Sequence, residues 1–128
     1  LKKAKGLGVG IIGRTPFNFG FLTDRGVNMG LDFGPEDHRS SWPMEQRSAW
    51  QKAARLLSEV EPRHPLATLA LSFCLNTDGV STVIPGMLTA NDVMANTSAS
   101  SLGSLSEQTR KKIRQIYEDN NQFFIKPS

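Results

Sequence analysis

The stretch 81-STVIPGMLTANDVMAN-96 decides the fold of this chain. A short β-branched run, Ser81–Ile84, predicts a strand that stops at Pro85 and Gly86, and a helical pattern begins near Thr89, which suits an N-cap. A glycine turn between a strand and a helix can seat an anion such as a nucleotide phosphate, because glycine lets a ligand approach the backbone and helix N-terminal amides carry partial positive charge. The same residues also fit a plain strand-to-helix turn, and the pattern alone does not separate the two.

A second strand is predicted at Val9–Arg14, a continuous apolar run typical of buried parallel strands. The segment before it, Leu1–Gly8, is typical of the end of a helix with glycines at its C-cap, and we interpret it as the entry into the middle of something larger. The stretch 17–43 is rich in glycine and phenylalanine and predicts a long, ordered loop.

Helical periodicity accounts for most of the remaining chain. We expect a helix capped by Ser41, with Pro43 in its first turn and one apolar face made of Trp50, Ala53, Ala54 and Leu57. A buried helix over 66–75 then leads to a strong turn at 76–79. The helix after Thr89 runs to about Ser98.

A last helix is predicted from the capping-box spacing of Ser104 and Glu107 to about Asp119, with an apolar stripe of Ile113, Ile116 and Tyr117. Strands that alternate with helices indicate an α/β fold with a parallel sheet and right-handed connections. We treat residues 1–128 as a single partial domain, because two strands need neighbours to make a stable sheet.

Composition excludes several classes of function. The chain has 15 basic and 12 acidic residues, a balance too mild for a nucleic-acid-binding surface, and no apolar run long enough for a membrane span. The single cysteine, Cys74, lies in an apolar helical pattern and is expected to be a buried thiol in a reducing, cytoplasmic setting. No residue spacing is typical of a metal site.

These segments, in this order, resemble the C-terminal part of an aldo-keto reductase. The stretch GVGIIGRTPFNFGFLT is similar to the seventh strand and its loop, PLATLALSFCLNTDGVSTVIPGMLTANDVMAN to the seventh helix and the eighth strand–helix unit, and LSEQTRKKIRQI to the C-terminal helix. The resemblance implies the last part of a (β/α)8 TIM barrel, with two parallel strands and flanking helices, and a parent activity of hydride transfer between NADPH or NADH and a carbonyl or alcohol. Such barrels place phosphate sites after strands seven and eight.

The resemblance also implies cofactor-binding residues, taken position by position. Those that match the pyrophosphate turn are Thr15, Pro16, Phe17 and Gly20. Those that match the end of the eighth strand, near the ribose phosphate, are Ile84, Gly86 and Met87, and Asn96 matches the residue that bonds the adenine. Leu88 stands where NADPH-binding members carry a cation, and Asp92 adds a negative charge close by, so NAD is slightly favoured over NADP.

No catalytic residue is expected in this chain, because the catalytic Asp, Tyr, Lys and His of the family come from earlier strands. His38, His64 and Tyr117 match none of these positions. The expected partners are the remainder of the barrel or further copies of the chain, with a small carbonyl substrate only in the complete enzyme. The alternatives are a non-catalytic relic that binds a nucleotide or a protein partner, and a purely structural module.

Overall fold

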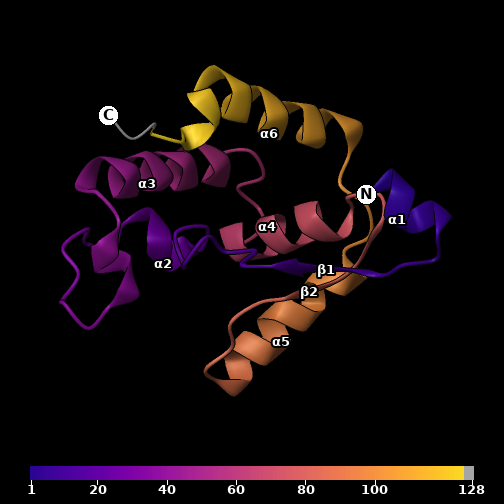
Figure 1. Ribbon diagram of the computed structural model, residues 1–128, viewed down its shortest axis with the longest axis horizontal. Helices are drawn as coiled ribbons and strands as arrows, with labels where there is room; N and C mark the ends of the chain where they lie inside the picture. The colour runs from indigo at the N-terminus through magenta and orange to yellow at the C-terminus, as the bar shows by residue number, and fades with distance from the viewer. Residues whose placement is uncertain (126–128) are drawn as a thin grey trace.

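A computed structural model describes residues 1–125 of the chain (Figure 1). Two strands and six α-helices follow one another in the order α1 (Lys2–Gly6), β1 (Ile11–Arg14), α2 (Asp24–Val27), α3 (Met44–Ser58), α4 (Leu66–Leu75), β2 (Val80–Ile84), α5 (Ala90–Ser98) and α6 (Glu107–Asp119). Three short 3-10 turns lie at His38–Ser41 (η1), Ala99–Ser101 (η2) and Asn121–Phe123 (η3). The predicted order of strands and helices is confirmed.

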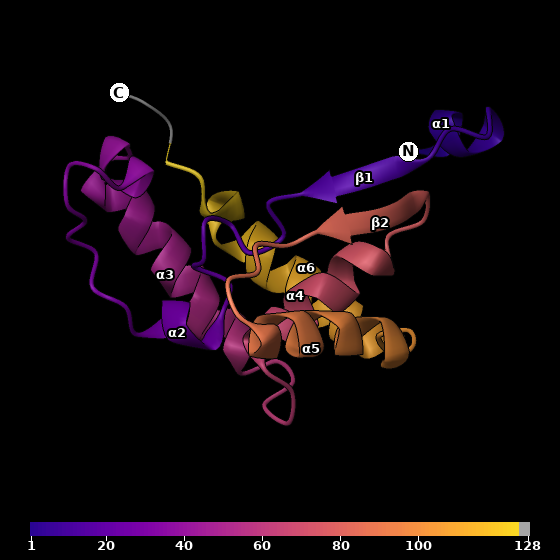
Figure 2. The ribbon, with the colours of Figure 1, turned by 90° about the horizontal axis from the view of Figure 1, so that it is seen from below.

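The two strands form a parallel sheet in which Ile12 pairs with Thr82 and Arg14 with Ile84. A bulge lies between Ile11 and Ile12, and there the Ser81 hydroxyl accepts a hydrogen bond from the Ile11 amide at 3.1 Å. Both arrowheads point the same way in Figure 2, so the carboxyl ends of the strands lie at one edge.

Helix α4 begins and ends where the sequence predicts, because its run of apolar residues is bounded by Pro65 and by the turn at 76–79. Gly79 has a φ of +91°, a left-handed conformation that glycine adopts without strain. This turn sends the chain from α4 directly into β2, and α4 packs against that strand.

Two apolar clusters hold the helices together. The first joins Phe21, Trp50 and Phe123, and the second joins Ala54, Leu66, Leu69 and Ile113. Helix α3 contributes to both clusters, because Trp50, Ala53 and Ala54 lie on one buried face, as its spacing predicts. Figure 1 shows the result: α6 lies across α3 and α4, and the strands lie on the other side of α4.

The loop over 17–43 also contains the short helix α2 and the turn η1. Three other local predictions are wrong. Helix α3 has Pro43 at its N-cap position, while the Ser41 hydroxyl belongs to η1 and donates to the His38 carbonyl at 2.6 Å. The last helix is capped by Ser106, whose side chain accepts from the Thr109 amide, and not by Ser104. Cys74 is half-buried.

The sheet has one covered and one open face. Alternation along the strands directs Ile12 and Ile84 away from α4, and these side chains are 60% and 53% exposed. Within residues 1–125, neither strand has a second neighbour. An apolar cavity of about 610 Å³ lies beside the sheet, between Pro16, the α4 residues Leu69 and Phe73, and α6. The described chain therefore leaves apolar surface uncovered on the sheet and beside it.

The close packing around Gly26 gives a test of the fold. A Cβ atom at Gly26 would lie 2.2 Å from the Phe21 carbonyl oxygen and 2.4 Å from that of Gly20. Gly26→Ala is expected to lower the free energy of unfolding in a urea titration by roughly 1–3 kcal/mol, because this backbone cannot move aside without disturbing the turn.

Gly30→Ala is the matched control, since a Cβ atom there would meet nothing within 4 Å. Equal stability of the two variants would contradict the packing of α2 against the 17–22 turn.

Candidate functional site

The site is built from two turns, residues 15–20 after β1 and residues 85–89 after β2. Parallel pairing of Arg14 with Ile84 places both turns at the carboxyl edge of the sheet, although they are far apart in the sequence (Figure 2). In open α/β arrangements and barrels, ligands bind at this edge. The structure thus brings the two predicted groups of cofactor residues together.

The turn after β1 has an unusual backbone. Thr15, Asn18 and Phe19 all have positive φ angles, of 54°, 45° and 58°, and Gly20 follows with 90°. Non-glycine residues rarely adopt this region, and each costs on the order of 1–3 kcal/mol unless its surroundings enforce it. The turn is closed by hydrogen bonds from the Gly20 and Leu22 amides to the Phe17 carbonyl, at 3.0 and 2.9 Å.

Within the described residues, the amides of Phe17 and Phe19 in this turn make no hydrogen bond. Unpaired amides in a tight turn of this kind form a concave binding site for an anion. Pro16, between them and the strand, is buried.

Thr23 anchors the far side of this turn. Its hydroxyl donates to the Gly20 carbonyl at 2.8 Å and accepts from the Gly26 amide at 3.1 Å. It therefore caps α2 and holds Gly20 in place. Phe17 and Gly20, which were predicted to hold a pyrophosphate, are fixed at opposite ends of one closed turn.

The turn after β2 is organised by Asp92. Its carboxylate accepts from the amides of Leu88 and Thr89, at 3.0 and 2.9 Å, and the Thr89 hydroxyl accepts from the Asp92 amide at 3.1 Å. This is a complete capping box, so Thr89 is the N-cap as predicted. Asn96, about one helical turn after Asp92 on α5, donates to the Gly86 carbonyl at 3.3 Å.

The top of this turn is open. A Cβ atom built on Gly86 would meet nothing within 4 Å, and Met87 and Leu88 are 46% and 97% exposed. The amides of Gly86 and Met87 make no hydrogen bond within residues 1–125. Nothing in the described chain prevents an anion from reaching this backbone.

Charge at this edge comes from Arg14 at the end of β1 and from Asp92 and Arg25. Hydrogen bonds from the Leu88 amide and from Thr89 hold the pKa of the Asp92 carboxyl below its ordinary value, and the positive charge of Arg25 adds to the effect. Asp92 therefore caps the start of α5, in addition to the repulsion of a 2′-phosphate that the sequence predicts. Arg25, on α2, is a cation that sequence reasoning missed, because only the fold brings α2 to the same edge as α5.

The remaining candidates lie elsewhere. The His38 ring packs against Phe19, with 5.2 Å between ring centroids, and His64 is exposed. Tyr117 lines the apolar cavity on α6. Over residues 1–125, no cluster of His, Cys, Asp and Glu could hold a metal ion, and no helix is long and apolar enough to cross a bilayer.

The fold and this edge define a class of protein: an α/β unit with two parallel strands that matches part of a barrel. The model of the aldo/keto reductase family matches residues 1–118, and the chain belongs to that family. A similar solved structure is the aldo-keto reductase AKR11C1 from Bacillus halodurans in its apo form, with 25% sequence identity and a TM-score of 0.61. That match covers 91% of this chain and 37% of the other. No curated protein matches this chain.

The capping role of Asp92 predicts a pH dependence. Because folding lowers the pKa of Asp92, its contribution to stability is present above its unfolded pKa, near the ordinary 3.8, and is lost as the pH falls through the lower folded value. Asp92→Asn should remove this part of the acid sensitivity in urea titrations between pH 6 and about pH 2.

Glu36→Gln is the control, since Glu36 lies on the surface and makes no ion pair or side-chain hydrogen bond among the described residues. An Asp92→Asn protein with the same pH profile as the parent would show that the capping box is not formed in solution.

Proposed function

We propose that this chain supplies the phosphate and adenine contacts of the dinucleotide site in an NAD(P)-dependent oxidoreductase of aldo-keto reductase type. The observation that carries the proposal is the pair of unpaired amides at Phe17 and Phe19, at the same sheet edge as the open turn at Gly86. Backbone amides that have no internal partner are suited to the oxygens of a diphosphate.

In this proposal, each of the two turns contacts a different part of the cofactor. Thr15, Pro16, Phe17 and Gly20 form the turn for the pyrophosphate, and Ile84, Gly86 and Met87 form the approach for the ribose phosphate. Asn96 donates to the Gly86 carbonyl through its amide nitrogen, which directs its side chain to this edge and leaves its oxygen for the adenine. When bound, the cofactor supplies a hydride to a carbonyl carbon, or takes one from an alcohol.

Protonation of the carbonyl oxygen falls to the remainder of the barrel in this proposal. The open sheet face with Ile12 and Ile84, the unpaired strand edges and the apolar cavity support such a partner, because together they are the surfaces that a barrel buries. This remainder belongs to the same polypeptide or to another chain, and a small carbonyl compound binds only to the assembled site.

The cofactor proposed is NAD, with NADP bound more weakly. Leu88 offers no cation to a 2′-phosphate, and its amide is already bonded to the Asp92 carboxylate. A phosphate near Leu88 would therefore meet a negative charge. Arg25 lowers this repulsion without removing it. We also propose a cytoplasmic location, where nicotinamide cofactors and a free thiol such as Cys74 are both expected.

A second candidate function is nucleotide binding without catalysis, by this unit alone or in self-association. It is favoured by the positions of His38, His64 and Tyr117, none of which hydrogen bonds to the two turns among the described residues. The two functions share the same binding edge, and they differ in whether an assembled barrel reduces a carbonyl.

The cofactor preference can be changed by one substitution. Leu88→Arg should raise the affinity for NADPH relative to NADH by about tenfold or more, because a charge-assisted pair contributes roughly 1.5–3 kcal/mol. Met94→Arg is the matched control: it adds the same charge to α5 at another exposed position. The measurement is the ratio of the two dissociation constants in the full polypeptide. An equal rise in both variants would place the 2′-phosphate elsewhere.

The open space above Gly86 allows a test of binding without a change in fold. Gly86→Val should leave the unfolding midpoint nearly unchanged, since a Cβ atom there meets nothing within 4 Å in the described chain, and should weaken NADH binding by about tenfold or more. Gly34→Val adds the same bulk at another open glycine and should bind normally. Unchanged NADH affinity in Gly86→Val would contradict the proposed site.

A further inference from the structure

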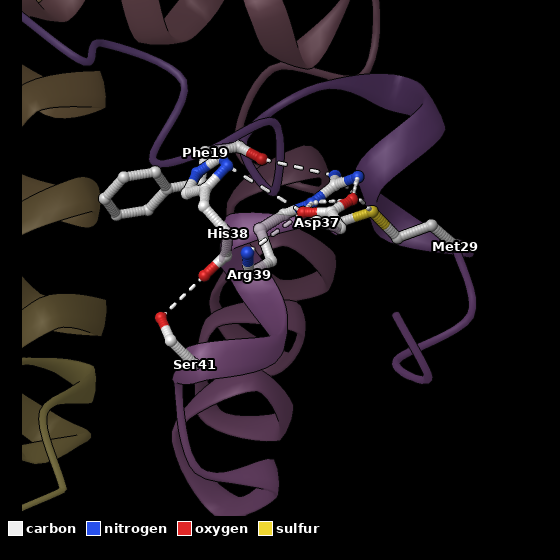
Figure 3. A network of polar contacts seen from close by, with 6 residues as sticks. All are labelled: Phe19, Met29, Asp37, His38, Arg39 and Ser41. Atoms are coloured by element: carbon white, nitrogen blue, oxygen red, sulfur yellow. Dashed lines mark hydrogen bonds and ion pairs between the residues drawn. The ribbon is translucent and has the colours of Figure 1, made fainter. Parts of the chain in front are cut away.

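One residue outside the two turns reaches the backbone of the first. Arg39, in η1, directs its guanidinium to the Phe19 carbonyl, to which its Nη1 donates at 3.5 Å (Figure 3). The same nitrogen lies 3.9 Å from the Met29 sulfur. Arg39 comes from the long loop over 17–43 and thus connects the end of that loop to its beginning.

The guanidinium is held from two sides. Its Nε donates to both carboxylate oxygens of Asp37, at 2.9 and 3.1 Å, and Nη2 donates to the second of them. The Phe33 ring stacks beneath it, with 4.2 Å from Cζ to the ring centroid. A planar fork bonded at one side and stacked at its face keeps a fixed direction.

The ring of Phe19 is held as firmly as its carbonyl. It packs against His38, Trp42 and Trp50, with centroid separations of 5.2, 6.0 and 5.8 Å. With ring and carbonyl both fixed, Phe19 stays at its φ of 58°, and the amide on its other side keeps its direction. Without these contacts, the residue would relax toward negative φ and the neighbouring peptide planes would rotate.

We propose that Arg39 is a positioning residue for the pyrophosphate turn. It holds the Phe19 carbonyl, and through it keeps the amides of Phe17 and Phe19 turned toward the diphosphate of a dinucleotide. The inference rests on the proposed function, in which this turn takes the diphosphate. The inference assigns a role to the later part of the loop over 17–43, which is to fix the backbone of the turn at residues 15–20.

Arg39 acts through geometry and not through its net charge. The Asp37 carboxylate is ionised at neutral pH, its pKa lowered to about 2 by the hydrogen bonds with Arg39, and its ion pair with Arg39 offsets the positive charge beside it. A lysine would keep the charge but lose the fork that binds Asp37 and Phe19 together. Arg39→Lys should therefore behave like Arg39→Gln.

The experiment compares two ligands in the full polypeptide. NADH carries the diphosphate, and adenosine carries the adenine and ribose without a phosphate. Arg39→Gln and Arg39→Lys should each weaken NADH by about tenfold and leave adenosine within about twofold of the parent protein. A purely structural role for Arg39 would weaken both ligands alike. Asp37→Asn, which keeps the arginine but loosens its hold, should weaken NADH selectively and to a smaller extent, and it replaces Arg39→Gln if that variant does not fold.

The outcomes separate the two proposals. A parent protein that binds neither ligand overturns the proposed function and this inference with it. A parent that binds NADH while the Arg39 and Asp37 variants bind it equally well overturns the role of Arg39 alone. A parallel loss of NADH and adenosine, or full rescue by Arg39→Lys, also overturns it. Selective loss of NADH supports it.

Discussion

The parallel pairing of β1 with β2 is the constraint on which the rest of this structure depends. It joins segments that lie at opposite ends of the α2–α4 region, and it sets both strand ends at one edge. Gly13 fits closely in this register, because a Cβ atom there would lie 2.7 Å from the Val83 side chain. A larger residue at that position would require the Val83 side chain to shift. Helix α4 can then cover one face of the sheet only, and the opposite face with Ile12 remains open.

The two turns at this edge differ in how their backbone amides are hydrogen-bonded. The turn after β1 stores strain in left-handed residues and leaves the Phe17 and Phe19 amides without partners among the described residues. In the turn after β2, the Asp92 carboxylate accepts from the amides of Leu88 and Thr89, and the amides of Gly86 and Met87 have no partner within residues 1–125. In the proposed site, the first turn binds a diphosphate strongly, and the second accepts a phosphate only beside a carboxylate. This arrangement is the physical basis for favouring NAD.

Sequence reasoning succeeds where short-range chemistry decides the outcome. The bounds of α4 follow from its apolar run between Pro65 and the turn at Gly79, and the start of α5 follows from the capping chemistry of Thr89. The resemblance to a known family predicted cofactor residues in both turns. The sheet brings these two turns to one edge, and their binding role stays a prediction. The choice of Ser104 over Ser106 failed because both serines fit the rules for helix starts, and only the actual geometry of the chain selects one.

The rest depends on contacts between distant residues, which a single sequence does not reveal. Nothing near Arg39 in the sequence indicates that it bonds to the Phe19 carbonyl, and nothing near Arg25 indicates that its charge reaches Asp92. The central claim, that both turns form one dinucleotide site, is tested most directly by amide chemical-shift mapping of the full polypeptide during titration with NADH. We expect saturable shifts that are largest at Phe17, Phe19, Gly86 and Met87. Saturable shifts confined to the cavity between α4 and α6, or none at either turn, would contradict the claim.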